Sequence, residues 1–250
     1  MRAPWLASPF GMRILMKIIR WALSLFFAST ILAVVAIRFI PVFVTPLMVI
    51  RCFQNGNLTM HHRWIPLDEM SPHMPVAVMA SEDSRFLLHH GFDLDAIGKA
   101  AKRNLSSSTT HKYGASTISQ QTAKNVFLWP GRSWVRKGFE VYFTALIELF
   151  WSKQRIMEVY LNSIEMGDGI YGLSACAQYN FGKSARDLSR NDCALIAATL
   201  PNPRRFSSKN PSGYMRLRQR QIKANMRYIP SFPKEGEDYD PHTAVGGTYR

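Results

Sequence analysis

The sequence is poor in cysteine and in acidic residues, and both shortages narrow what the protein can be. Only three cysteines occur in 250 residues, at positions 52, 176 and 193. Because this number is small and odd, a disulfide framework is not expected. Cys176 and Cys193 lie among small residues, which indicates that they are packed in the interior. Zinc-ligand spacing and tandem aromatic-basic signatures are also missing, so nucleic acid is not the expected partner.

The scarcity of acids gives the chain a formal net charge of +14, from 31 basic and 17 acidic side chains. Residues 1–50 hold five cations and no acid, so residues 51–250 still carry 26 cations against 17 acids, or +9. The excess therefore extends well beyond the N-terminal segment. A basic domain favours an anionic partner, such as an acidic membrane surface or a phosphorylated substrate.

One long apolar run lies near the N-terminus. Residues 21–37, WALSLFFASTILAVVAI, contain no charge, and extension to residue 40 gives a helix of about 30 Å, the thickness of the hydrocarbon core of a bilayer. We predict a basic N-terminus over 1–20, a transmembrane helix over 21–40 and a membrane-associated linker or jaw over 41–64. A cleaved signal peptide is the alternative, and the apolar continuation favours a retained anchor. Cations ahead of the span place the N-terminus in the cytoplasm and the following domain outside.

Strand-like alternation is absent from the rest of the chain, whereas helical periodicity recurs. We therefore expect a nearly all-helical domain over 65–229. Residues 230–250 hold four acids, three prolines and little apolar content, which predicts a disordered tail. The segment 162–172 holds three glycines and is predicted as a loop.

Two further segments belong to this helical pattern. Ser71-Pro72 is predicted to open a helix that Gly91 ends, with Glu82 and Asp83 in its C-terminal half. Residues 106–112, SSSTTHK, are polar and lack periodicity, which predicts a mobile loop suited to gating a substrate.

The span that follows this loop, residues 114–140, concentrates the polar chemistry of the chain. Its sequence is GASTISQQTAKNVFLWPGRSWVRKGFE. Ser116 is predicted to cap a helix reaching about Val126, on which Gln121 and Asn125 fall in one polar row. Amides beside cations suggest capture of a phosphate-bearing, sugar-like molecule near a carboxylate. A solvated polar helix face is the alternative reading of the same pattern.

Four motifs in chain order resemble those of the peptidoglycan glycosyltransferases, glycosyltransferase family 51. They are EDSRFLLHHGFD at 82–93, GASTISQQTAKN at 114–125, RKGFE at 136–140 and KQRIMEVYLN at 153–162. The resemblance covers about residues 65–207 and, with one anchor and no transpeptidase domain, is closest to the monofunctional biosynthetic members. It implies a lysozyme-like, two-lobed, all-α domain behind one N-terminal transmembrane helix. It also implies a bacterial inner-membrane location with a periplasmic catalytic domain.

The activity implied by the resemblance is polymerisation of lipid II into glycan strands. The growing chain is transferred with inversion from undecaprenyl diphosphate to the 4-hydroxyl of the acceptor. The expected partners are thus lipid II, the lipid-linked glycan strand, the membrane and other cell-wall synthesis proteins.

The resemblance assigns roles residue by residue. Glu82 matches the general base, with Asp83 orienting neighbouring groups. The substrate-binding positions are Asp83, Ser116, Gln121, Lys124, Asn125, Arg132, Arg136 and Lys137. Lys124 and Arg132 match the cations that neutralise the departing diphosphate.

Glu140 matches the second carboxylate of the family. Arg136 and Lys137 precede it by one helical turn and favour its charged form, so it suits an electrostatic stabiliser better than an acid. The resemblance requires no cofactor. A divalent cation, Mg or Mn, bridging the diphosphate is an optional addition, although no metal-ligand constellation is evident.

Two other functions remain to be weighed. A lysozyme-like lytic enzyme would use Glu82 as a general acid, but it would need an apolar setting and would not need diphosphate-binding cations. A catalytically silent scaffold anchored in the membrane is the third possibility, against which the intact motifs argue.

Overall fold

The computed structural model describes residues 9–56, 59–106, 116–131, 133–234 and 236–237. The chain divides into two compact units, with the division between residues 40 and 41. The predicted gating loop lies outside the described residues except for its first member, Ser106, whose side chain is not described.

The first unit is one long helix, α1, Pro9–Ile37. Its residues 10–37 are long and apolar enough to cross a membrane, with a mean hydropathy of 2.0 over the most apolar window. The helix begins well before the predicted start at residue 21, because proline is tolerated at a first helical position and the basic residues that follow are good helix formers. It ends shortly before Pro41, which cannot extend a helix.

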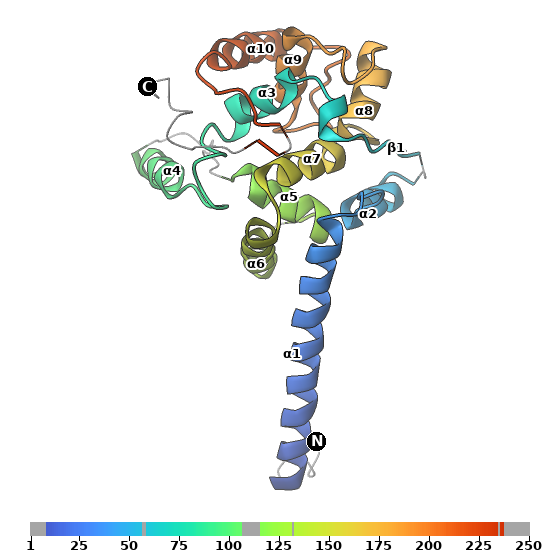
Figure 1. Ribbon diagram of the computed structural model, residues 1–250, viewed down its shortest axis with the longest axis vertical. Helices are drawn as coiled ribbons and strands as arrows, with labels where there is room; N and C mark the ends of the chain where they lie inside the picture. The colour runs from blue at the N-terminus through green and yellow to red at the C-terminus, as the bar shows by residue number, and fades with distance from the viewer. Residues whose placement is uncertain (1–8, 57–58, 107–115, 132, 235, 238–250) are drawn as a thin grey trace. The chain divides into compact units, whose positions relative to one another are not determined.

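The second unit is the domain, and most of it is helical. Its α-helices are α2 Pro46–Asn55, α3 His73–Glu82, α4 Leu94–Ser106, α5 Ile118–Phe127, α6 Trp134–Phe150, α7 Lys153–Ser163, α8 Gly172–Cys176, α9 Arg190–Thr199 and α10 Gly213–Asn225. A short 3-10 turn, η2, covers Leu67–Glu69, and a π-helical turn, η3, covers Ala177–Phe181. Figure 1 shows these elements in chain order by colour.

The helices of the domain pack in two groups. Helix α9 packs against α3 and α10, while α5 packs against α6 and α7 (Figure 1). Fully buried side chains of both groups form the core, among them Met74, Met79, Ile118, Ile147, Met157 and Tyr160. Burial of such side chains is the dominant favourable term for folding.

A small sheet accompanies the helices, and the domain is nearly all helical as predicted. Strands β1 His61–His62, β2 Glu165–Gly167 and β3 Ile170–Tyr171 form it in the order β1-β3-β2. The segment 162–172, predicted as a loop, therefore contains two strands, which are too short for alternation to reveal them. Gly172 follows directly with φ 77°, and a Cβ there would lie 2.6 Å from the Asn162 carbonyl oxygen.

The helix predicted from Ser71 to Gly91 is shorter than expected. Helix α3 ends at Glu82, and Asp83 is its C-terminal cap residue in an extended conformation. The Ser71 hydroxyl does not cap the helix but donates to the carbonyl oxygen of Leu188 at 2.7 Å. Glu82 therefore stands at the end of a helix rather than within one.

The cap of α5 was also predicted one residue too early. Thr117, not Ser116, is the N-cap, and its hydroxyl accepts from the Gln120 backbone N–H at 3.2 Å while the Gln120 side chain accepts from the Thr117 N–H at 3.1 Å. This reciprocal capping box uses Gln120 locally. The Thr117 hydroxyl also donates to the Gly91 carbonyl oxygen at 2.7 Å.

Residues 230–234, the start of the predicted tail, are in contact with the domain. Pro233 is buried, and the ring of Phe232 stacks on that of Phe86 with centroids 6.4 Å apart. This contact covers the segment that follows Glu82.

Candidate active site

A cavity of about 320 Å³ lies between α2, α5, the start of α6, α7 and β2. Four of the predicted substrate-binding residues line it, namely Gln121, Lys124, Asn125 and Arg136. Gln121, Lys124 and Asn125 all come from α5, so one short helix forms much of this wall. The cavity therefore joins two motifs that are separate in the sequence.

Glu82 is tied to this cavity through Gln121. Its carboxylate accepts from the Ser81 hydroxyl at 3.0 Å and from the Gln121 side-chain N–H at 3.1 Å. The Gln121 carbonyl oxygen in turn accepts from the Tyr160 hydroxyl at 3.2 Å. Burial, together with Glu82 and Asp83, raises the pKa of Tyr160 well above its usual range, so the phenol remains a donor. The contact chain orients the Glu82 carboxylate and links α3, α5 and α7.

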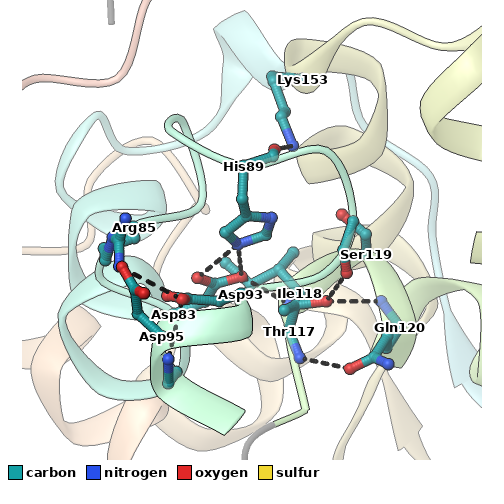
Figure 2. A network of polar contacts seen from close by, with 12 residues as sticks. Asp83, Arg85, His89, Asp93, Asp95, Thr117, Ile118, Ser119, Gln120 and Lys153 are labelled. Carbon is teal, nitrogen blue, oxygen red and sulfur yellow. Dashed lines mark hydrogen bonds and ion pairs between the residues drawn. The ribbon is translucent and has the colours of Figure 1, made fainter. Parts of the chain in front are cut away.

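Asp83 makes the contacts expected of a residue that orients neighbouring groups. It is buried, and its carboxylate accepts from the Ile118 backbone N–H at 3.0 Å and contacts His89 Nε2 at 3.0 Å (Figure 2). Among the described residues, those lining the cavity do not include Asp83. It fastens the segment after α3 to the first turn of α5.

Asp83 belongs to a cluster of residue types that can bind a metal ion, but the carboxylate oxygens of this cluster already contact other protein groups. Ligand atoms of Asp83, His89 and Asp93 lie within 4.8 Å of one another. Both Asp83 oxygens are already engaged, and the guanidinium of Arg85 lies 3.4 Å from Asp93 (Figure 2). The Asp93 carboxylate also accepts from the Ala96 backbone N–H at 2.9 Å, as a helix cap. These contacts satisfy the carboxylates without an ion.

Lys153, the first residue of α7, contacts the segment that carries His89. Its ammonium donates to the Glu148 carboxylate at 2.8 Å and to the His89 carbonyl oxygen at 2.6 Å, as Figure 2 shows for His89. It also lies 4.5 Å from the centroid of the Phe86 ring. A lysine with these partners supports the segment that carries His89.

The cations of the site surround a buried carboxylate. Glu140 is 3% exposed; Arg136 Nη1 donates to it at 3.2 Å, and Lys137 Nζ forms a second ion pair with it. Arg136 also keeps a buried Nε–H with no hydrogen-bond partner among the described residues. Because Arg136 lines the cavity, this donor is available to a ligand there.

Lys124 has the electrostatics of a buried anion-binding lysine. Burial lowers its pKa, with Glu140 and Glu82 acting in the opposite direction and Arg136 in the same direction. These influences place the two predicted catalytic carboxylates in the field of one ammonium. An anionic ligand would offset the cost of its burial.

The contacts of Glu140 do not favour coordination of the optional divalent ion that could bridge the diphosphate. Each of its two oxygens already has a cationic partner, one from Arg136 and one from Lys137. Hard cations need oxygen ligands that are free to coordinate them. No step described below passes through a metal.

Two predicted residues remain apart from this geometry. Ser116 is exposed and precedes the cap of α5. Arg132 lies outside the described residues.

Tyr160 was missed although it falls within the motif KQRIMEVYLN, because a motif does not tell which side chain of its helix reaches another helix. Arg51 and Glu165, which also line the cavity, lie outside the quoted motifs.

Comparison with known proteins shows the family to which the chain is similar. The family model described as Transglycosylase matches residues 51–227. A biosynthetic peptidoglycan transglycosylase of Bacteroides thetaiotaomicron is 62% identical over 224 residues, which cover 87% of this chain and 90% of the relative. Proteins of the same description from Bdellovibrio bacteriovorus and Caulobacter vibrioides are 53% and 52% identical; the matches cover 86% and 78% of this chain, and 86% and 83% of the relatives.

Proposed function

The chain belongs to the transglycosylase family, and from that premise we propose which of its residues polymerise glycan strands. It is a peptidoglycan glycosyltransferase of cell-wall synthesis with a lysozyme-like helical domain. Its substrate is lipid II. One observation carries the assignment of residues: Gln121, which lines the cavity, donates to the Glu82 carboxylate at 3.1 Å.

Glu82 acts as the general base. Inversion requires removal of the acceptor proton on the side opposite the leaving diphosphate. The proton of the acceptor 4-hydroxyl passes to Glu82 as its oxygen attacks the anomeric carbon, and the bond to the diphosphate breaks. Ser81 and Gln121 both donate hydrogen bonds to the Glu82 carboxylate. Such donors favour its ionised form, which is the form that can accept a proton.

Lys124 and Arg136 hold the diphosphate of the donor chain. Both line the cavity, and Arg136 Nε offers a buried donor without a partner among the described residues. Asn125, 7% exposed and in the same wall, adds a neutral donor. Fixed cations aimed at a departing phosphate stabilise the charge that develops there. Arg132 remains a predicted member of this set.

Glu140 is an electrostatic partner rather than an acid or base. It keeps Arg136 and Lys137 in place, and its charge acts on the neighbouring Lys124. It would also favour positive charge that develops on the donor sugar. Its loss would leave the two cations with one fewer anchor.

The membrane arrangement follows from charge and exposure. Helix α1 is consistent with a single-pass anchor, and the five cations without an acid in residues 1–50 favour a cytoplasmic N-terminus. Exposed apolar residues of the domain support contact with the outer face of the same membrane, where lipid II is held. They include Val49 and Phe53 on α2 and Trp134, Val135 and Leu149 on α6.

The lytic alternative is less well supported. A hydrolase would need a proton on Glu82 to donate to the glycosidic oxygen, whereas the two contacts of Glu82 present donors to it. It would also have no use for buried cations in the cavity wall. A silent scaffold would retain these groups without turnover, which only an assay separates from an enzyme.

The test is polymerisation of labelled lipid II by the full-length protein in detergent. We expect wild-type protein to form polymer, and Glu82→Gln to lose about 10²- to 10⁴-fold in rate, the range for removal of a general base. Glu69→Gln, a change at an exposed glutamate, should retain the rate. No polymer from the wild type would favour the scaffold, and undiminished polymer from Glu82→Gln would remove Glu82 from the mechanism.

A further inference from the structure

Glu165, the first residue of β2, carries a carboxylate that the mechanism above does not use. It lines the same cavity as Lys124 and Arg136. Its side chain is only 8% exposed, and Arg51 Nε lies 3.7 Å from its Oε2. That separation is an ion pair but exceeds hydrogen-bond distance, and within the described part of the chain the carboxylate has no hydrogen bond.

Arg51 also has a hydrogen-bonding group for which the described residues supply no partner. It projects from α2 into the cavity wall, and its Nη1 donates to Gln54 at 2.8 Å. Its Nε–H is buried and has no hydrogen-bond partner among the residues described. Buried polar groups are normally paired, so, within the described ranges, the unpaired Nε–H of Arg51 beside a carboxylate without a hydrogen bond favours a ligand that contacts this part of the cavity wall.

The electrostatics of Glu165 agree with this geometry. Burial raises the pKa of its carboxyl, and Asp168 acts in the same direction, while Arg51 and Arg204 oppose the rise. The surrounding cations thus do not fully offset the loss of water. An acidic group left under-solvated in a cavity is typical of a functional position.

The sign of the charge limits what Glu165 can bind. A carboxylate repels phosphate, so it cannot share the role of Lys124 and Arg136. It is a single carboxylate in a wall that also holds three cations, Arg51, Lys124 and Arg136, which disfavours a divalent metal. A neutral group that donates hydrogen bonds suits it, and a sugar beside the diphosphate offers hydroxyl and amide N–H groups.

We propose that Glu165, supported by Arg51, binds the sugar of the lipid-linked donor by accepting a hydrogen bond from a hydroxyl or amide N–H next to the diphosphate. The inference rests on the proposed function, because it places the donor diphosphate in this cavity. Glu165 thereby distinguishes a sugar-bearing lipid diphosphate from the bare lipid diphosphate that the reaction releases.

The test compares the binding of two probes, lipid II and undecaprenyl diphosphate, to full-length protein in detergent. Glu165→Leu removes the acceptor, and we expect about tenfold weaker binding of lipid II, the lower limit for a hydrogen bond to a charged group. Binding of undecaprenyl diphosphate should be unchanged or tighter, because the Glu165 carboxylate repels phosphate. Glu165→Gln keeps an amide oxygen as acceptor and should give a smaller loss.

Asp168→Asn is the matched control, because it removes an acidic charge from the adjacent turn at a side chain that is 65% exposed. It should change the binding of neither probe. Equal weakening of both probes by Glu165→Leu, or no weakening of either, would overturn the proposal. So would a Glu165→Leu protein that loses a dependence of binding on Mg²⁺ shown by the wild type, because Glu165 would then be a metal ligand.

Two controls separate this inference from other failures. Glu165→Leu leaves Arg51 without its ion-pair partner, so its unfolding temperature should fall. Both probes are therefore measured well below that temperature, where a purely structural role of Glu165 predicts equal weakening of both. If the wild type forms no polymer, the proposed function fails. If the wild type polymerises lipid II while Glu165→Leu binds it normally, only the role of Glu165 fails.

Discussion

Gln121 donates a side-chain hydrogen bond to Glu82 across a separation of 39 residues in the chain, at 3.1 Å. The amide has no freedom to turn away, because its carbonyl oxygen accepts from the Tyr160 hydroxyl at 3.2 Å. The base is thereby oriented by a residue of the helix that also carries Lys124. Helix α5 therefore holds the proposed base in position and also carries one of the proposed diphosphate cations, Lys124.

Replacement of Gln121 by leucine should therefore lower turnover more than substrate affinity. Loss of a hydrogen bond to a charged group corresponds to about a 10- to 100-fold lower rate. The measurement is the rate of polymerisation against lipid II concentration, with Gln221→Leu on the exposed face of α10 as the control. An increase in KM with an unchanged kcat would mean that Gln121 binds substrate and does not orient Glu82.

Lys124→Ala should weaken the binding of undecaprenyl diphosphate by about 10- to 100-fold, because one charge-assisted contact is removed. The control is Lys99→Ala, at an exposed lysine of α4. Binding of the lipid diphosphate by the alanine variant at wild-type affinity would remove Lys124 from the diphosphate site.

The lowered pKa of Lys124 predicts an alkaline limit to diphosphate binding. Since its folded pKa lies below its unfolded pKa, the lysine loses its charge at a lower pH than an exposed lysine does. Affinity should fall as pH rises through that lowered pKa, while stability should rise over the same interval because the cost of a buried charge is relieved. Lys124→Arg, which stays charged, should remove the alkaline fall in affinity.

Lys153→Arg provides the control for this pH dependence. Burial also lowers the pKa of Lys153, but its ammonium contacts Glu148 and not the cavity. The alkaline fall in diphosphate binding should persist in this variant. Its disappearance there, and not in Lys124→Arg, would assign the titration to Lys153.

Asp83→Ala should destabilise the domain by about 2–4 kcal/mol, because the Ile118 N–H and His89 would both lose a buried partner. Thermal unfolding of the full chain in detergent measures this loss, with Asp68→Ala at an exposed position as the control. Weaker lipid II binding at an unchanged unfolding temperature would return Asp83 to the substrate-binding role predicted from sequence.

Thr117→Ala should lower the free energy of unfolding by about 1 kcal/mol or somewhat more, since the hydroxyl both caps α5 and donates a hydrogen bond to Gly91. Ser116→Ala, one residue earlier and exposed, should change the free energy of unfolding by less than about 0.5 kcal/mol. Chemical denaturation of both variants decides between the two caps. A larger loss from Ser116→Ala would support the cap that the sequence predicted.

Much of the secondary structure was predictable because it depends on neighbours in the chain. The Ser133 and Ser189 hydroxyls cap α6 and α9 through contacts within three residues, and the Asp192 side chain completes a capping box with Ser189. Errors arose where a local signal had a competitor. Thr117 was as good a cap as Ser116, and the decision came from its bond to Gly91, which is distant in sequence.

The small sheet and the end of α3 escaped prediction for a related reason. Strand β1 pairs with β3 across a long separation, and neither strand is long enough to show alternation. Helix α3 ends at Glu82 because the Asp83 side chain bonds to Ile118 and His89 rather than continuing the helix face. Contacts of this kind are formed by packing and leave no periodic trace.

The residues themselves were enough to indicate the family, the helical class and the long apolar N-terminal helix, because ordered motifs and periodicity are properties of a linear chain. Tertiary structure alone decided that Asp83 is a buried brace, that Tyr160 orients Gln121, and that Arg51 and Glu165 share the cavity wall. These roles depend on distances between helices and strands that only packing sets.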